Sequence, residues 1–157
     1  MTRLHLLTNG NRISYIRHMA KPVPLPDDER AAPPEISDRE TTAMLRAFFN
    51  LTERWQLNDR QGRILLGDPA ARTYARWKVG QVEASRISRD TRERLSMLMG
   101  IHKSLRHLFR DPSRGYDWLR KPNRAFGGTS VLDRLLAGSI PDLAAVRVYL
   151  DAERGGW

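Results

Sequence analysis

The chain has no cysteine among its 157 residues. This excludes disulfides and thiolate metal ligands, and it favours a reducing compartment. The sequence also has no apolar run near the roughly 18 residues that a membrane-spanning helix needs, and no apolar segment near the N-terminus that is followed by a small-residue cleavage site. We therefore expect a cytoplasmic protein with no membrane partner.

Histidine is also scarce, and the four histidines are scattered. His102 and His107 stand five residues apart, which places them on different faces of a helix. No nucleophile–base pair and no phosphate-binding glycine loop can be recognised. We expect no catalytic residues, no metal site and no cofactor, and hence a protein that acts by binding and is not an enzyme.

Positive charge is abundant. Lys and Arg number 27 against 18 Asp and Glu, which gives a formal net charge of +9. Such an excess favours a polyanionic partner through counterion release and electrostatic steering. The alternative is a basic protein without such a partner, and the position of the charges along the chain bears on this choice.

The chain divides by composition. Residues 1–36 are rich in proline and charge, which favours extended conformations, and we predict a flexible N-terminal arm. Beyond it the apolar residues recur at helical spacing, with no useful alternation of period two. We predict an all-α fold in which a helix-turn-helix unit, residues 37–87, is joined by a long helix to a small helical domain within residues 88–157.

Three helices are predicted in the first unit. Ser37 and Glu40 have the spacing of a capping box, which predicts a first helix that ends near residue 57. Asp59 is the predicted cap of a second helix that ends at the break of Gly67, and Asp68 that of a third helix, residues 69–78. Two short helices joined by a glycine turn are typical of a helix-turn-helix.

The third predicted helix carries the residue types that contact DNA. Between residues 60 and 94 there are nine Lys or Arg against four Asp or Glu. Trp77 is expected to pack between helices, and the alternative for the rest is a solvated basic face. Arg63 stands where such motifs usually have a small residue, with Gly62 beside it, so we expect the helices to cross differently. The predicted DNA contacts are Arg60, Arg63, Arg72, Thr73, Arg76 and Lys78.

A long helix is predicted from the cap Ser88 to about residue 110, as a strut and as the surface of a homodimer. The segment 118–138 follows, in which Pro122, Asn123 and the pair Gly127-Gly128 predict a turn with positive φ angles or a close backbone approach. The alternative is an ordinary loop with its aromatic residues in the core. Short helices are predicted on both sides of the double glycine, and a last helix begins near residue 140.

The stretch W-L-R-K-P-N-R-A-F-G-G from Trp118 to Gly128 resembles the motif W-L-x-x-P-N-x-x-(L/F)-G-G of the Xre/MbcA/ParS antitoxin family. The L-D and L-L pairs after it resemble that family's continuation P-L-D-L-L, and residues 65–67 and 76–77 resemble its Xre-like helix-turn-helix. The resemblance covers roughly residues 38–157. It departs at Val131, where the family has proline, at the inserted Arg134, and at Asp151, where the family's L-x-R-I-E-x-G has arginine.

The resemblance implies an antitoxin that covers the active site of a RES-domain toxin, a class that consumes NAD or transfers ADP-ribose from it, and that binds the operator DNA of its own operon. Lys121, Asn123 and Arg124 are expected to be more exposed than the aromatic residues, and Trp157 either enters a pocket of the toxin or packs on its own helices. The alternative function is a stand-alone helix-turn-helix regulator whose C-terminal half dimerises. The predicted toxin contacts are Trp118, Lys121, Pro122, Asn123, Arg124, Phe126, Gly127, Gly128, Glu153, Arg154 and Trp157.

Overall fold

The computed structural model describes residues 35–155. The predicted arm, residues 1–36, lies almost entirely outside the described residues, as does Trp157. Every regular element within residues 35–155 is helical, which confirms the all-α class. The α-helices are α1 (Asp38–Arg54), α2 (Asp59–Leu65), α3 (Ala71–Lys78), α4 (Arg89–Leu108), α5 (Pro112–Trp118), α6 (Val131–Leu136) and α7 (Ile140–Gly155), and the short 3₁₀ turns are η3 (Ala84–Arg86) and η4 (Arg124–Phe126).

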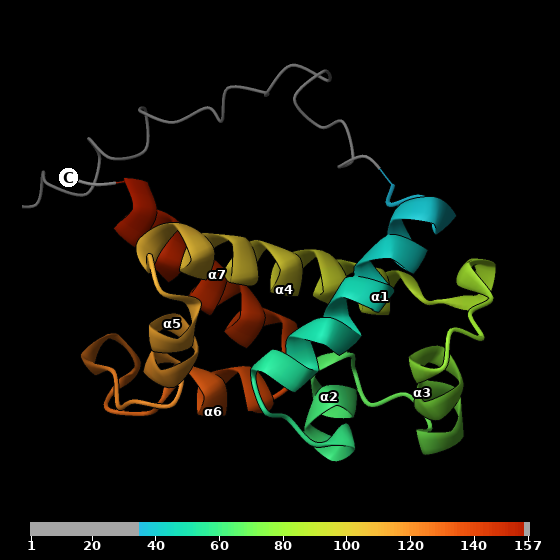
Figure 1. The fold of residues 1–157 in the computed structure, drawn as a ribbon, viewed down its shortest axis with the longest axis horizontal. Coiled ribbons are helices and arrows are strands. Elements are labelled where there is room, and N and C mark those ends of the chain that lie inside the picture. Colours follow the sequence, from blue (N-terminus) through green and yellow to red (C-terminus); the bar gives the residue numbers. More distant parts are fainter. Residues whose placement is uncertain (1–34, 156–157) are drawn as a thin grey trace, which may run out of the picture. The chain divides into compact units, whose positions relative to one another are not determined.

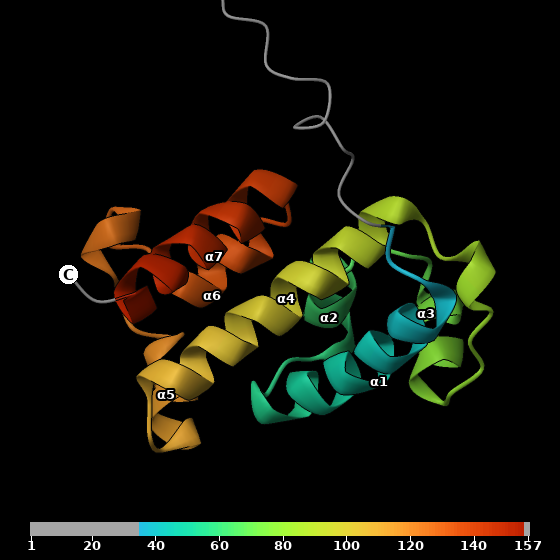
Figure 2. The ribbon, with the colours of Figure 1, turned by 90° about the horizontal axis from the view of Figure 1, so that it is seen from above.

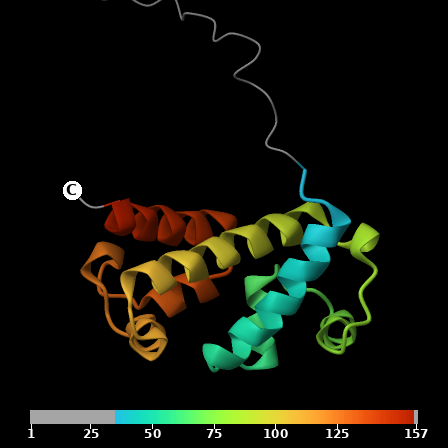
Figure 3. The same ribbon diagram turned by 45° about the horizontal axis from the view of Figure 1, so that its top comes forward.

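The longest helix, α4, is the centre of the fold. Helix α1 packs along one side of it and α7 along the other (Figure 2). Leu95, Leu98, Ile101 and Leu105 form its buried stripe, as the helical spacing predicted. Helix α3 lies toward the N-terminal end of α4, whereas α5 and the loop after it lie toward the C-terminal end (Figure 1, Figure 3). Helix α3 and the loop after α5 are therefore at opposite ends of α4.

Local capping residues fix two of the helix starts. Ser37 accepts a hydrogen bond from the Glu40 amide, and Glu40 accepts one from the Ser37 amide at 2.9 Å, which confirms the capping box. Ser88 caps α4 by accepting from the Thr91 amide at 3.2 Å. For α2 the predicted cap was wrong. Asn58 caps the helix, because its side chain and that of Gln61 each accept a hydrogen bond from the other's amide.

The start of α3 also differs from the prediction. The helix begins at Ala71 without a side-chain cap. Gly67 and Asp68 both have positive φ, 86° and 55°. The turn then continues through residues 69 and 70, which were expected to be helical. Asp68 cannot cap α3, because its carboxylate lies 2.7 Å from Arg63 Nη2 at the other side of the turn.

The crossing of α2 and α3 depends on Gly62, the neighbour of Arg63. A Cβ at Gly62 would lie 2.0 Å from the Tyr74 hydroxyl oxygen, so no larger residue fits. Tyr74 is only 2% exposed, and burial raises its pKa to about 12. Arg63 instead donates to the Pro69 carbonyl at 2.7 Å. The small residue of this crossing is therefore Gly62.

No helix within residues 35–155 is both long enough and apolar enough to cross a membrane.

Candidate functional site

Hydrogen bonds of Asn123 organise the loop between α5 and α6. The Asn123 side chain accepts from the Ala125 amide at 2.9 Å, and its carbonyl accepts from the Phe126 and Gly128 amides at 3.1 and 2.9 Å. Its own amide donates to the Thr129 carbonyl at 3.2 Å. The loop therefore holds its shape through its own backbone, with no partner needed.

The double glycine serves the backbone conformation of this loop. Gly127 and Gly128 have φ angles of 64° and 86°, which side chains rarely adopt. A Cβ at either position would meet nothing within 4 Å, so close approach within the chain is not the reason for glycine. At Gly127 and Gly128 the backbone of the loop is thus uncovered and open to a partner.

Four aromatic rings attach the loop and α5 to α7. Trp118 stacks on Tyr149 with ring centroids 6.3 Å apart and planes at 4°, and Phe126 meets the same ring edge-on at 5.3 Å. Phe109 lies 5.8 Å from Trp118. All four rings are partly buried against the core. Trp118 and Phe126 are therefore neither free contacts nor fully buried core residues, and each retains an accessible part.

Two members of this cluster, Phe109 and Tyr149, were missed in the sequence. Phe109 ends α4 and Tyr149 lies beside the buried stripe of α7 at Val146 and Leu150. The only signal in the sequence is an aromatic residue next to, and not on, a helical apolar stripe.

The predicted toxin contacts differ in exposure. Asn123 is half-buried and not as exposed as expected, because its polar groups bond within the loop. In the last turn of α7, Glu153 and Arg154 are exposed. The exposed predicted contacts in the loop segment are Lys121, Pro122, Arg124, Gly127 and Gly128.

Asp151, which replaces an arginine of the motif, joins α7 to α4. It accepts from Ser104 Oγ at 2.7 Å and from Arg147 Nε at 2.7 Å. The hydrogen bond from Ser104, followed by that from Arg147, lowers the pKa of Asp151 below its usual value. A Cβ at Gly100 would lie 1.5 Å from Arg147, so glycine on α4 makes room for this group. Asp151 thus bonds within the molecule.

The predicted DNA contacts lie on and around α3. Arg60, Arg72, Arg76 and Lys78 are exposed, whereas Arg63 and Thr73 are half-buried. Lys78 pairs with Asp59 at 2.8 Å and Arg63 with Asp68 at 2.7 Å. Arg60 and Arg72 form no ion pair with any residue of the described part.

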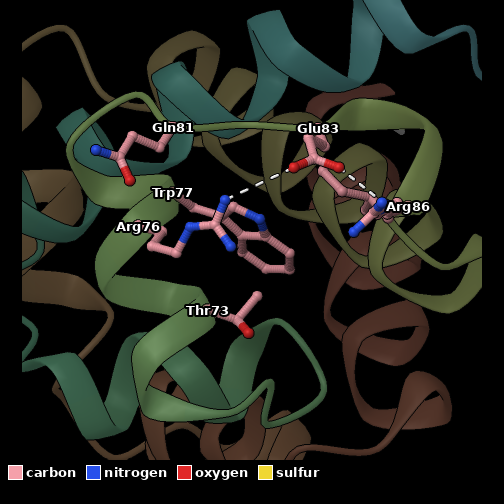
Figure 4. A pocket seen from close by; sticks show the side chains of 7 residues that line it. Thr73, Arg76, Trp77, Gln81, Glu83 and Arg86 are labelled. Atoms are coloured by element: carbon pink, nitrogen blue, oxygen red, sulfur yellow. Dashed lines mark ion pairs between the residues drawn. The ribbon is translucent and has the colours of Figure 1, made fainter.

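A cleft of about 270 Å³ separates α3 from the segment that leads to α4 (Figure 4). Thr73 and Arg76 come from α3, and Glu83 and Arg86 face them from the other side. Trp77 lines the same cleft and packs against the core, as expected for this residue. The cleft therefore contains two of the predicted DNA contacts and an arginine, Arg86, that was not predicted.

Comparison with known proteins adds the family. The model of the antitoxin Xre/MbcA/ParS C-terminal toxin-binding domain matches residues 104–156, which include the loop and the aromatic cluster. The chain is also 41% identical over 127 residues to the uncharacterized protein y4oB of Sinorhizobium fredii (strain NBRC 101917 / NGR234), a match that spans 81% of this chain and 96% of that protein. Together with the loop motif, these matches show that the chain belongs to the Xre/MbcA/ParS antitoxin family.

Proposed function

We propose that this chain is an antitoxin that acts by binding, without catalysis of its own. Its partner is a RES-domain toxin that consumes NAD or transfers ADP-ribose, and the antitoxin neutralises this toxin by covering its active site. Helix α3 binds operator DNA, so that the same chain represses its own operon. The observation that carries the proposal is the rigid loop of residues 121–130, which lies inside the matched toxin-binding domain.

The loop is well suited to a protein interface. Its conformation is fixed before binding, so association costs little ordering entropy. Bare backbone at Gly127 and Gly128 lets a partner approach closely, and the exposed side chains beside it, Lys121 and Arg124, can form charged contacts. A specific interface needs about 1,200–2,000 Å² of buried surface. We assign the accessible parts of Trp118 and Phe126 and the last turn of α7 to the same surface.

The charge around the loop indicates an acidic toxin surface. Residues 103–124 contain seven Lys or Arg and two Asp or Glu. None of these seven cations forms an ion pair with a residue of the described part of the chain. Complementary charge accelerates association and selects the partner. The seven cations are Lys103, Arg106, Arg110, Arg114, Arg120, Lys121 and Arg124.

The DNA-binding part of the proposal rests on α3. It follows α2 across a glycine turn, Tyr74 anchors it in the core, and Arg72 and Arg76 remain exposed. Two copies of α3 would read two half-sites, which calls for a homodimer. The cytoplasm is the compartment in which operator DNA and this toxin class are both found.

A second candidate function is a stand-alone regulator that dimerises through its C-terminal half. Val148 favours it, because this large apolar side chain of α7 is 69% exposed and a second copy would cover it. Such a regulator forms homodimers and has no protein partner of another kind.

Co-expression separates the two functions. The chain, with an affinity tag, is produced together with the product of its neighbouring gene. The antitoxin proposal predicts that the two proteins copurify and that growth, arrested by the neighbour alone, is restored. A homodimer that retains no neighbour and restores no growth would contradict the antitoxin proposal and favour the regulator.

A further inference from the structure

Glu83 stands between two arginines at the edge of the cleft beside α3. One carboxylate oxygen lies 2.8 Å from Arg86 Nε and the other lies 3.7 Å from Arg76 Nη2 (Figure 4). We infer that Glu83 occupies the position of a DNA backbone phosphate, that this cleft is a phosphate site for duplex DNA, and that Arg86 is a DNA contact. The inference rests on the proposed DNA-binding function and deepens it.

The segment that carries Glu83 and Arg86 is held in place. Arg92, whose side chain is only 12% exposed, donates to the carbonyls of Ala84 and Ile87 at 2.7 and 3.2 Å. The Arg86 amide also donates to the Glu83 carbonyl at 3.0 Å, which closes the turn η3. The nearly buried guanidinium of Arg92 therefore holds the backbone of this turn in place, while the side chains of Glu83 and Arg86 remain accessible.

The groups that line the cleft match a phosphate. Guanidinium groups bind carboxylate and phosphate oxygens in the same planar geometry, so a site that holds a carboxylate between two arginines can also hold a phosphate. Thr73 and Gln81 also line the cleft, and side chains of these two types can donate hydrogen bonds to a phosphate. The side chains of Arg76, Glu83 and Arg86 are 54%, 52% and 81% exposed, so DNA can reach them.

The carboxylate makes the site conditional. Exposed ion pairs are weak, so a correctly placed phosphate can replace the Glu83 carboxylate as the partner of both arginines. As long as the Glu83 side chain stays in its ion-paired conformation, however, its negative charge repels the phosphate. Glu83 therefore lowers the affinity for DNA, most of all for DNA that is held by few other contacts. A phosphate bound in the cleft also adds about one to the number of phosphates that the protein neutralises, and so to the number of cations released from the DNA.

The test is a titration of labelled duplex DNA, operator and unrelated, at several salt concentrations. For Glu83→Gln we expect affinity for unrelated DNA to rise about three- to tenfold, with a salt slope steeper by about one. The matched control is Glu93→Gln, which makes the same charge change and breaks a similar ion pair, to Arg89 at 2.9 Å, outside the cleft. An equal gain in both variants would overturn the inference, because net charge alone would then explain it.

Arg86→Ala tests the same site in the opposite direction. We expect weaker binding, a salt slope shallower by about one, and no remaining gain when Glu83→Gln is added. Unchanged binding by Arg86→Ala would overturn the inference.

Inorganic phosphate, compared with chloride at equal ionic strength, tests the source of the phosphate. We expect it to displace the duplex no better than chloride. Specific displacement at millimolar phosphate would overturn the assignment to DNA in favour of a site for a small anion. The failure of the proposed function gives a different result. If the wild-type protein binds no duplex at low salt, DNA binding itself is contradicted. If the wild-type protein binds normally but the Glu83 and Arg86 variants give the contradicting results named above, only this inference is contradicted.

Discussion

Two stretches of this antitoxin carry the same charge and use it differently. Residues 60–94 have nine cations against four acids, and residues 103–124 have seven against two, so each has a net charge of +5. In the first stretch seven of the nine cations form ion pairs, and in the second none does so with a described residue. Net charge alone therefore does not identify a binding surface. Ion pairing separates the cations that already have an acidic partner in the chain from those that have none among the described residues.

The nearly buried cations of residues 60–94 show that ion-paired arginines can hold the fold together. Arg94 is 8% exposed and donates to Asp90 and to the Gly138 carbonyl, both at 2.7 Å. Arg92 joins the start of α1 to the turn η3 through Asp38 and Ala84. These arginines link elements far apart in the sequence. Among the seven cations of residues 103–124, only Arg120 has such a bond to a described residue, the Trp55 carbonyl.

The largest expected effect is on stability and comes from the paired set. Arg94→Ala leaves the Gly138 carbonyl without its buried donor and opens a cavity, so we expect the free energy of unfolding to fall by about 3 kcal/mol. Arg106→Ala, in the unpaired set, should change it by less than about 0.5 kcal/mol. Chemical denaturation measures both. Similar losses in the two variants would remove the distinction between the stretches.

Trp118→Ala is expected to have the next largest effect, in two ways. The half-buried ring stacks on Tyr149, so its loss should cost about 2 kcal/mol, less than the roughly 3–5 kcal/mol of a fully buried aromatic residue. The accessible part of the ring should also contribute to the interface, so toxin neutralisation weakens in protein that is still folded. Thermal melting and toxin binding are measured on the same sample. A folded variant that neutralises normally would place Trp118 outside the interface.

The glycine turns allow a matched pair of smaller changes. Gly128→Ala and Gly80→Ala each place a side chain at positive φ, 86° and 81°, in open space. Each should therefore cost a similar free energy of unfolding, about 1–2 kcal/mol. Only Gly128→Ala lies in the loop that we propose faces the toxin, and we expect it alone to weaken toxin binding, by at least about tenfold. Equal effects of the two variants on toxin binding would show that strain in general, and not the loop, is responsible.

The sequence was sufficient where a feature depends on neighbours in the chain. The capping signals of Ser37 and Ser88 predicted two helix starts correctly, and the Pro-Asn and Gly-Gly pairs predicted the turn. It failed where distant groups compete. Asp68 bonds to Arg63 and does not cap α3, and the room for Tyr74 comes from Gly62 in the preceding helix.

The candidate site follows the same rule. The loop could be predicted from its motif, but its aromatic support could not, because Tyr149 is remote in sequence from Trp118 and Phe126. The pairing of each cation was equally inaccessible. Arg92 pairs with Asp38, a residue 54 positions away, and no local pattern shows that Arg60 and Arg72 remain unpaired while Arg76 faces Glu83.

The most direct test of the account reverses charge on each of the two proposed binding surfaces and measures the affinity for both partners in each variant. The pair Lys121→Glu with Arg124→Glu should weaken the complex with the proposed toxin at least about tenfold at low salt, with operator binding changed less than about twofold. The pair Arg60→Glu with Arg72→Glu should do the opposite. Both variants should melt like the unchanged protein, because none of the four residues forms an ion pair within residues 35–155. Toxin affinity that falls equally in the two variants, or only in the second, would contradict the assignment of the unpaired cations of 103–124 to the toxin.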